Sequence, residues 1–173
     1  VAACGKTLLE RHSPLRDLLR ARLGLPQAML CAWLTFMLAL HDAGKFSYRF
    51  QRLREDFPAL EPNPSLETQY HPRHDTLGAI LWFGRLERIV MDRFVAEPAR
   101  SRQTRTALRF WMGTAVGHHG QPPKPGQARP AGLFTAADQQ AAAAFCIDAG
   151  QLLLDGCDLN PADAKAFAAA IKP

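Results

Sequence analysis

Five of the six histidines fall at three places in the chain, each at a boundary between an apolar stretch and a loop-like one. The three places are His41 with its neighbour Asp42, His71 with His74, and His118 with His119. Imidazole nitrogens and carboxylate oxygens are common ligands of divalent transition metals. Helix ends that face one cleft can hold such ligands rigidly, while the adjoining loops leave an open side. The spacing therefore predicts a metal site where helix ends converge.

Taken singly, these residues have simpler explanations. A His-Asp dipeptide arises by chance, a His near a helix C-terminus is favoured by the helix dipole, and paired histidines are common on surfaces. Their joint occurrence favours a metal site, because Gly44 and Lys45 follow the carboxylate and glycines flank the third place. His12 lies apart from the others, between two expected helices, and we interpret it as a surface residue.

The most apolar segment of the chain leads directly into the first of these places. Pro26 to Leu40 is dense in leucine and aromatic side chains, which is typical of a helix buried on most sides. His41 follows Met37 by four residues and Leu34 by seven, so on a continuous helix it leaves the same buried face. We expect Gly44 to adopt the left-handed conformation that ends many helices.

The other apolar periodic segments also predict helices, and no alternating strand pattern competes with them. We expect them at Val1–Arg11, from a Ser13 cap to Gly24, at Asp75–Phe94 with His74 at its start, at Thr104–Val116, at Ala136–Leu154 behind a Thr135/Asp138 capping box, and after Asn160-Pro161. Long proline-rich loops are expected at 55–73 and 121–133. The fold class is therefore all-α, as a single domain over residues 1–173.

The composition indicates the cellular compartment and the class of binding partner. Hydrophobic residues make up 47% of the chain, but no apolar run reaches the roughly 20 residues that cross a bilayer, and no secretory signal is visible. We therefore expect a cytoplasmic protein with no membrane partner. The four cysteines are far apart without a C-x-x-C pair, which favours a reducing compartment. The formal charge of +5 favours a polyanionic partner, although arginines on solvated helix faces would give the same total.

Three motifs resemble a known family, the HD-superfamily nuclease domain of the type I CRISPR helicase-nuclease. They are His41-Asp42-Ala43-Gly44-Lys45 with Phe50-Gln51 after it, His74 with Gly78 four residues on, and Gly117-His118-His119-Gly120. The Phe-Gln placement and the double His separate this family from other HD proteins, and the resemblance covers roughly Val1 to Gly120. It implies a helical HD-domain bundle, divalent transition-metal ions as cofactors, and single-stranded DNA as the substrate.

The resemblance also implies which residues bind metal. His41 and Asp42 would be central ligands, with the carboxylate able to touch two ions, and the second position would be completed by His74, His118 and His119. We expect two ions, of manganese, nickel, iron or cobalt, with magnesium as the alternative. Water activated on such ions attacks a phosphodiester while the metals stabilise the developing charge.

Two departures from the family's pattern concern the ends of the chain. A further metal-binding His of the family would fall just before Val1, so we expect a domain cut short at its N-terminus. The family's late Asp ligand has Asp148 as its only candidate here, and otherwise lies beyond Pro173 with the domain's last helices.

The expected substrate contacts are basic and aromatic residues near the histidines. Lys45 would hold the scissile phosphate, although a solvated lysine that compensates the helix C-terminus is an equal alternative. The remaining candidates are Gln51, Lys124 and Arg129, the arginines Arg49, Arg52 and Arg54 for phosphate contacts, and Phe46, Tyr48 or Phe50 for base stacking. The basic residues could equally be solubilising loop charges.

The sequence thus predicts a metal-dependent nuclease domain that cleaves single-stranded DNA during CRISPR interference. Its partners would be a helicase domain, in the same chain or a separate one, and an RNA-guided surveillance complex. Two alternatives stay open. One is an HD phosphohydrolase acting on nucleotides or cyclic dinucleotides, and the other is a non-enzymatic helical module that binds nucleic acid through a basic face.

Overall fold

The computed structural model describes residues 1–53, 72–117, 119–120, 123 and 129–169. Within these residues the chain forms helices and no strand, apart from one isolated parallel bridge between Val95 and Leu159. The helices are α1 Ala2–Arg11, α2 Ser13–Leu23, α3 Gln27–Leu40, η1 Ala43–Phe46, α4 Tyr48–Gln51, α5 His74–Leu81, η2 Trp82–Leu86, α6 Glu87–Phe94, η3 Glu97–Ala99, α7 Arg102–Val116, η4 Pro130–Gly132, α8 Ala136–Leu153 and α9 Pro161–Ala169. The predicted all-α fold is confirmed.

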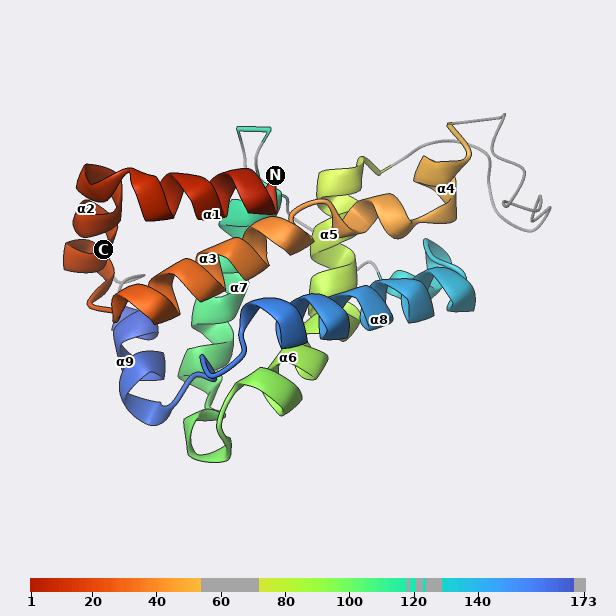
Figure 1. Cartoon of the computed structure of the whole chain (residues 1–173). Helices are drawn as coiled ribbons and strands as arrows, with labels where there is room; N and C mark the ends of the chain where they lie inside the picture. Colours follow the sequence, from red (N-terminus) through yellow and green to blue (C-terminus); the bar gives the residue numbers. More distant parts are fainter. Residues whose placement is uncertain (54–71, 118, 121–122, 124–128, 170–173) are drawn as a thin grey trace.

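Helix α3 is the central element of the bundle. It crosses the middle of the molecule with α1, α7 and α8 packed against it (Figure 1). Trp33 and Phe36 on this helix are fully buried, and the Trp33 indole donates a hydrogen bond of 2.9 Å to the carbonyl of Cys157. The apolar density of 26–40 therefore has the predicted cause, because this helix contacts neighbours on several sides at once.

Several helix ends form as the sequence indicates. Pro26 stands at the N-cap of α3, Gly24 ends α2 with a φ of 65°, and Thr135 with Asp138 forms the expected capping box of α8. The cap of α2 differs from the expectation. His12 takes that position and its Nδ1 accepts from the amide of Leu15 at 3.1 Å, while Ser13 is the first helical residue. His12 is exposed, as predicted, but it has a structural role.

Two helices differ in detail from their predicted forms. The segment predicted at Asp75–Phe94 starts at His74, as expected, but it runs through a π-helical stretch, η2, before continuing as α6. Helix α7 begins at Arg102, two residues before the predicted start, because Ser101 provides the cap by accepting from the amide of Thr104.

No single helix in the described part of the chain is long and apolar enough to cross a membrane. One pair, Ser13–Leu23 with Gln27–Phe46, passes by length and composition alone, but it is bent by 98°.

Candidate metal centre

His41 lies at the C-terminal end of α3, where the helix positions its ring directly. Its Nδ1 lies 2.6 Å from the carbonyl oxygen of Leu38 one turn earlier. A carbonyl only accepts hydrogen bonds, so Nδ1 carries a proton and donates, and Nε2 is the ring nitrogen left to bind a metal. Hydrogen bonding at one ring nitrogen fixes both the tautomer and the orientation of a metal-binding His. The helix end therefore presents Nε2 toward Asp42.

Close contact between η1 and α5 brings the second histidine to Asp42. A Cβ on Gly44 would overlap the carbonyl oxygen of His74 and crowd the amide nitrogen of Gly78, and a Cβ on Gly78 would lie 3.3 Å from the nitrogen of Gly44. The two glycines therefore let the backbones touch. Our prediction that Gly44 is a left-handed helix stop is wrong, since Gly44 has no positive φ and lies within η1.

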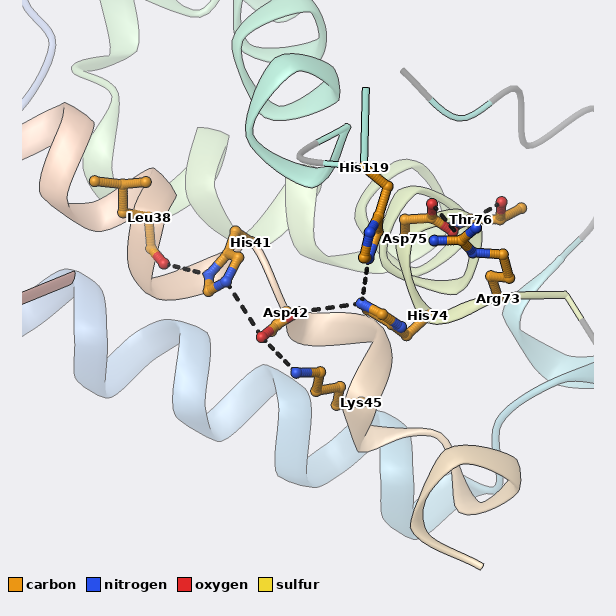
Figure 2. Close-up of polar contacts among 9 residues, drawn as sticks. All are labelled: Leu38, His41, Asp42, Lys45, Arg73, His74, Asp75, Thr76 and His119. Carbon is orange, nitrogen blue, oxygen red and sulfur yellow. Dashed lines mark hydrogen bonds and ion pairs between the residues drawn. The ribbon is translucent and has the colours of Figure 1, made fainter. Parts of the chain in front are cut away.

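Asp42 lies where three elements meet (Figure 2). Its Oδ2 is 2.7 Å from Lys45 Nζ and 3.2 Å from His41 Nε2, and its Oδ1 is 3.5 Å from His74 Nε2. Burial by itself raises the pKa of this carboxyl group, but the hydrogen bond from Lys45 and the nearby His41, Lys45 and His74 lower it by more. Asp42 is therefore a carboxylate at neutral pH, the form that binds a cation.

His74, which contacts this carboxylate, also faces His119. Their Nε2 atoms lie 3.1 Å apart, and the ring of Phe50 contacts that of His74 at 5.6 Å between centroids. Burial lowers the pKa of His74, and this outweighs the opposing effect of Asp42, with Lys45 and His119 lowering it further. A neutral imidazole is the form that ligates metal. His118, the other member of the predicted pair, lies outside the described residues.

The donor atoms fit a metal in type and in pairwise spacing. Two ligands bound to one ion at typical metal–nitrogen distances lie about 3.0–3.5 Å apart, and the His41–Asp42, Asp42–His74 and His74–His119 pairs are 3.2, 3.5 and 3.1 Å apart. Yet no group of three or more His, Cys, Asp or Glu side chains among the described residues is arranged to hold an ion. Metal binding therefore stays a prediction for this set.

A cavity of about 720 Å³ opens beside His41 and Asp42, between α1, α3 and α8. Most of its lining is apolar, but Lys6 and Asp148 also contribute to it. Asp148 is exposed on α8, and its position at the cavity places it on the same side as the two central residues. The structure thus brings the predicted late Asp to the same cavity as His41 and Asp42, whereas its role as a ligand stays a prediction.

The predicted substrate-binding residues have protein contacts of their own. Gln51 Nε2 donates to the carbonyl of Lys45 at 2.8 Å and so ties α4 to η1. Lys45 Nζ lies 2.7 Å from Asp42 Oδ2 and 5.5 Å from the centre of the Phe50 ring. Arg129 is exposed just before η4, while Lys124 and Arg54 lie outside the described residues.

The remaining aromatic and basic candidates also contact the protein. Phe46 packs against Phe145 at 5.5 Å, and the buried Tyr48 ring lies 5.6 Å beneath the guanidinium of Arg52. Ser47 caps α4, because its Oγ accepts from the amide of Arg49 at 3.3 Å. Their contact with a DNA strand stays a prediction.

Sequence reasoning missed the residues that hold α4 beside the histidines. Ser47 is completely buried, and its hydroxyl donates to the carbonyl of Leu133 at 3.0 Å. Asp138 Oδ2 accepts from the amide of Tyr48 at 3.1 Å and from the amide of Thr135 at 2.8 Å. The capping-box signal identified Asp138 as a helix cap, but nothing in the sequence indicates its second contact 90 residues away.

Comparison with known proteins identifies a family. The chain matches the family model described as Cas3, HD domain, over residues 1–171. The chain belongs to the Cas3 HD domain family. Comparison with curated proteins and with solved structures gave no match. The family model extends past the motifs at 41–45, 74–78 and 117–120 into α8 and α9, which the sequence motifs did not cover.

Membership in the Cas3 HD family makes this a CRISPR-associated HD nuclease domain, hence a hydrolase. HD domains are generally metal-dependent. The family also implies a role in type I CRISPR systems, which operate with a helicase and a surveillance complex. Three side chains, those of His41, Lys45 and His74, meet at Asp42, and His41 and Asp42 are the His-Asp pair of the first motif (Figure 2).

Proposed function

We propose that this domain hydrolyses phosphodiester bonds of single-stranded DNA during CRISPR interference, with divalent transition-metal ions bound at Asp42. The observation that carries the proposal is the meeting of His41, Lys45 and His74 on one carboxylate, with His119 beside His74. The residues that would hold metal are His41, Asp42, His74, His118 and His119, with Asp148 across the cavity. We infer two ions of manganese, nickel, iron or cobalt, with magnesium as the alternative.

A divalent ion in such a site activates water for attack on phosphorus and stabilises the charge that develops on the phosphate oxygens. The chain's own residues prepare the site for that role. The Leu38 carbonyl holds the proton of His41 on Nδ1, so that Nε2 is the ring nitrogen left to bind a metal. Lys45 holds Asp42 ionised and supplies a positive charge at the place where a phosphate would bind. The adjoining cavity gives a strand access to these groups.

The domain would act on a strand delivered by a helicase, fused or separate, within a cytoplasmic RNA-guided system. We propose that residues 1–173 form one HD nuclease domain. The excess of positive charge in the chain supports an anionic substrate.

The test is nicking of circular single-stranded DNA with each metal added in turn. We expect the protein to nick the circle, EDTA to abolish nicking, and Asp42→Ala and His74→Ala to lose it. His12→Ala is the matched control, because it removes a histidine that caps α2 far from Asp42 and should leave nicking intact.

Two outcomes would overturn the proposal. Release of product from free nucleotides or cyclic dinucleotides, with no cleavage of DNA, would identify a phosphohydrolase. DNA binding without cleavage, unchanged when His41 and Asp42 are both replaced by alanine, would identify a binding module instead.

A further inference from the structure

A second polar hollow lies away from Asp42, between the helical run formed by η2 and α6 and the neighbouring helix α7. Its volume is about 310 Å³, and it shares no lining residue with the cavity at His41 and Asp42. We call it the arginine pocket, after its main lining residues Phe83, Arg85, Glu87, Arg88, Arg105 and Arg109. Four arginines face one glutamate here, so the pocket has an excess of three positive charges.

The single carboxylate is fully engaged by the two arginines of α7. Glu87 is 3% exposed, and its two oxygens accept from Arg109 at 2.7 and 3.0 Å. Arg105 Nε lies 3.5 Å from Oε1 of the same carboxylate. A buried carboxylate needs such partners, and a paired guanidinium is held in a defined place. Glu87 therefore fixes the arginines of α7 but does not balance the charge of the pocket.

The two arginines on the other wall have no such partner among the described residues. Arg85 Nε is buried and makes no hydrogen bond within the described part of the chain, and Arg88 is exposed one turn later. A buried nitrogen donor that lacks an acceptor costs free energy unless a bound group supplies one. An anion in the pocket would satisfy Arg85 and offset the excess positive charge that Glu87 leaves.

Aromatic rings beside the arginines favour a nucleic-acid strand over an isolated anion. The Arg109 guanidinium stacks 5.3 Å from the centre of the Phe83 ring, and Phe110, the next residue, is 52% exposed. Proteins bind single strands by combining arginines that contact phosphates with exposed aromatic side chains that stack on bases. The arginine pocket supplies the first feature, and Phe83 in its lining and Phe110 on the same helix as Arg109 supply the aromatic rings.

The same helices connect the arginine pocket to the metal centre. Arg85 follows His74 by 11 residues on the run α5–η2, and Arg109 lies on α7, which leads into the segment of His119. At the rise of a helix, the separation along the α5–η2 run is about 16 Å. A strand bound at both places would span this separation with a few nucleotides.

We propose that the arginine pocket is a second binding site for single-stranded DNA, which holds phosphate groups of the strand a few nucleotides from the bond that is cut. The choice of DNA as the ligand rests on the proposed function. In this proposal the pocket raises the affinity of the protein for DNA and leaves the chemistry at Asp42 unchanged.

The test compares binding with hydrolysis of a substrate too small to reach the pocket. Binding of labelled poly-dT is measured by fluorescence anisotropy across a salt series for Arg85→Ala with Arg88→Ala, with circular dichroism to check folding. We expect affinity to fall at least about tenfold and the salt slope to become shallower by about 0.7 for each phosphate that the variant no longer neutralises. Hydrolysis of bis(p-nitrophenyl) phosphate should stay at the wild-type rate.

Two controls make the result decisive. Arg11→Ala with Arg22→Ala removes the same charge from exposed positions on α1 and α2, outside the pocket. Arg88→Glu changes only an exposed side chain, and should weaken binding even if the double variant folds poorly. Wild-type affinity in the pocket variants, or an equal loss in the Arg11/Arg22 control, would overturn the proposal. Failure to hydrolyse either substrate would overturn the proposed function alone, because the binding assay needs no cleavage.

Discussion

Gly44 touches the main chain of His74 so closely that a methyl group on Gly44 would overlap the His74 carbonyl oxygen. The contact joins η1, which follows Asp42, to the first turn of α5, which carries His74. The 3.5 Å separation between His74 Nε2 and Asp42 Oδ1 depends on it. A glycine in the HD motif is therefore a packing requirement of the site, although no ligand comes from it.

Gly44→Ala should separate these two elements and destabilise the protein by about 1–3 kcal/mol, the usual cost of forcing extra atoms into a packed contact. Nicking should fall with it, since Asp42 and His74 would move apart. Urea denaturation and the nicking assay measure the two effects. Gly113→Ala in α7 is the control, because its Cβ meets nothing within 4 Å, and it should leave stability equal or raise it by up to about 1 kcal/mol. Equal behaviour of the two variants would contradict the packing role.

Lys45→Met should slow cleavage by about 10- to 100-fold, because it removes the cation on Asp42 Oδ2 while keeping the length of the side chain. Lys45→Arg should recover part of the rate. Single-turnover cleavage of DNA is the measurement, and Lys165→Met, an exposed lysine on α9, is the control. A wild-type rate for Lys45→Met would support the alternative of a solvated lysine at a helix end.

Replacement by alanine should affect different properties at two aspartates on α8, stability at one and metal binding at the other. Asp138 accepts from the amides of Thr135 and Tyr48, so Asp138→Ala should cost about 1–2 kcal/mol of stability. Asp148 is exposed at the cavity beside Asp42, so Asp148→Ala should leave stability unchanged and weaken metal binding and nicking. Denaturation and calorimetric titration with manganese distinguish them. Unchanged metal affinity in Asp148→Ala would remove it from the ligand set.

Stability should fall in alkaline solution because of Cys146. Burial raises the pKa of this thiol from its ordinary value of 9.0 to about 12. Above pH 9 the unfolded chain releases the proton while the folded protein keeps it, so the free energy of unfolding decreases as pH rises toward 12. By about pH 10 the loss from this thiol alone should be about 1.4 kcal/mol.

Cys146→Ala isolates this effect, because all other titrating groups remain. At about pH 8 the variant should be less stable than the wild type, because it lacks the packing of the thiol side chain. Its stability should then decline less steeply as pH rises. Urea denaturation of both proteins at about pH 8 and pH 10 measures the two slopes. Parallel slopes would show that Cys146 titrates normally.

Local sequence signals were enough to predict the longer helices and many of their ends. The apolar density of 26–40 predicts a central buried helix, and signals such as Gly24 and the Thr135/Asp138 box identify helix ends, since they act within one turn of chain. The types and order of the HD residues, together with the motifs around them, led to the correct family. These features are local, so no long-range contact is needed to recognise them.

The assembly of the site, in contrast, depends on tertiary packing that no local signal reveals. The contact of Gly44 with α5, the second hydrogen bond of Asp138, the approach of Asp148 to the cavity and the grouping of four arginines each join residues that are far apart in the sequence. The misassigned Gly44 illustrates the reason. A glycine that permits a left-handed turn and a glycine that permits close packing look the same in sequence. Only the position of the neighbouring helix separates the two.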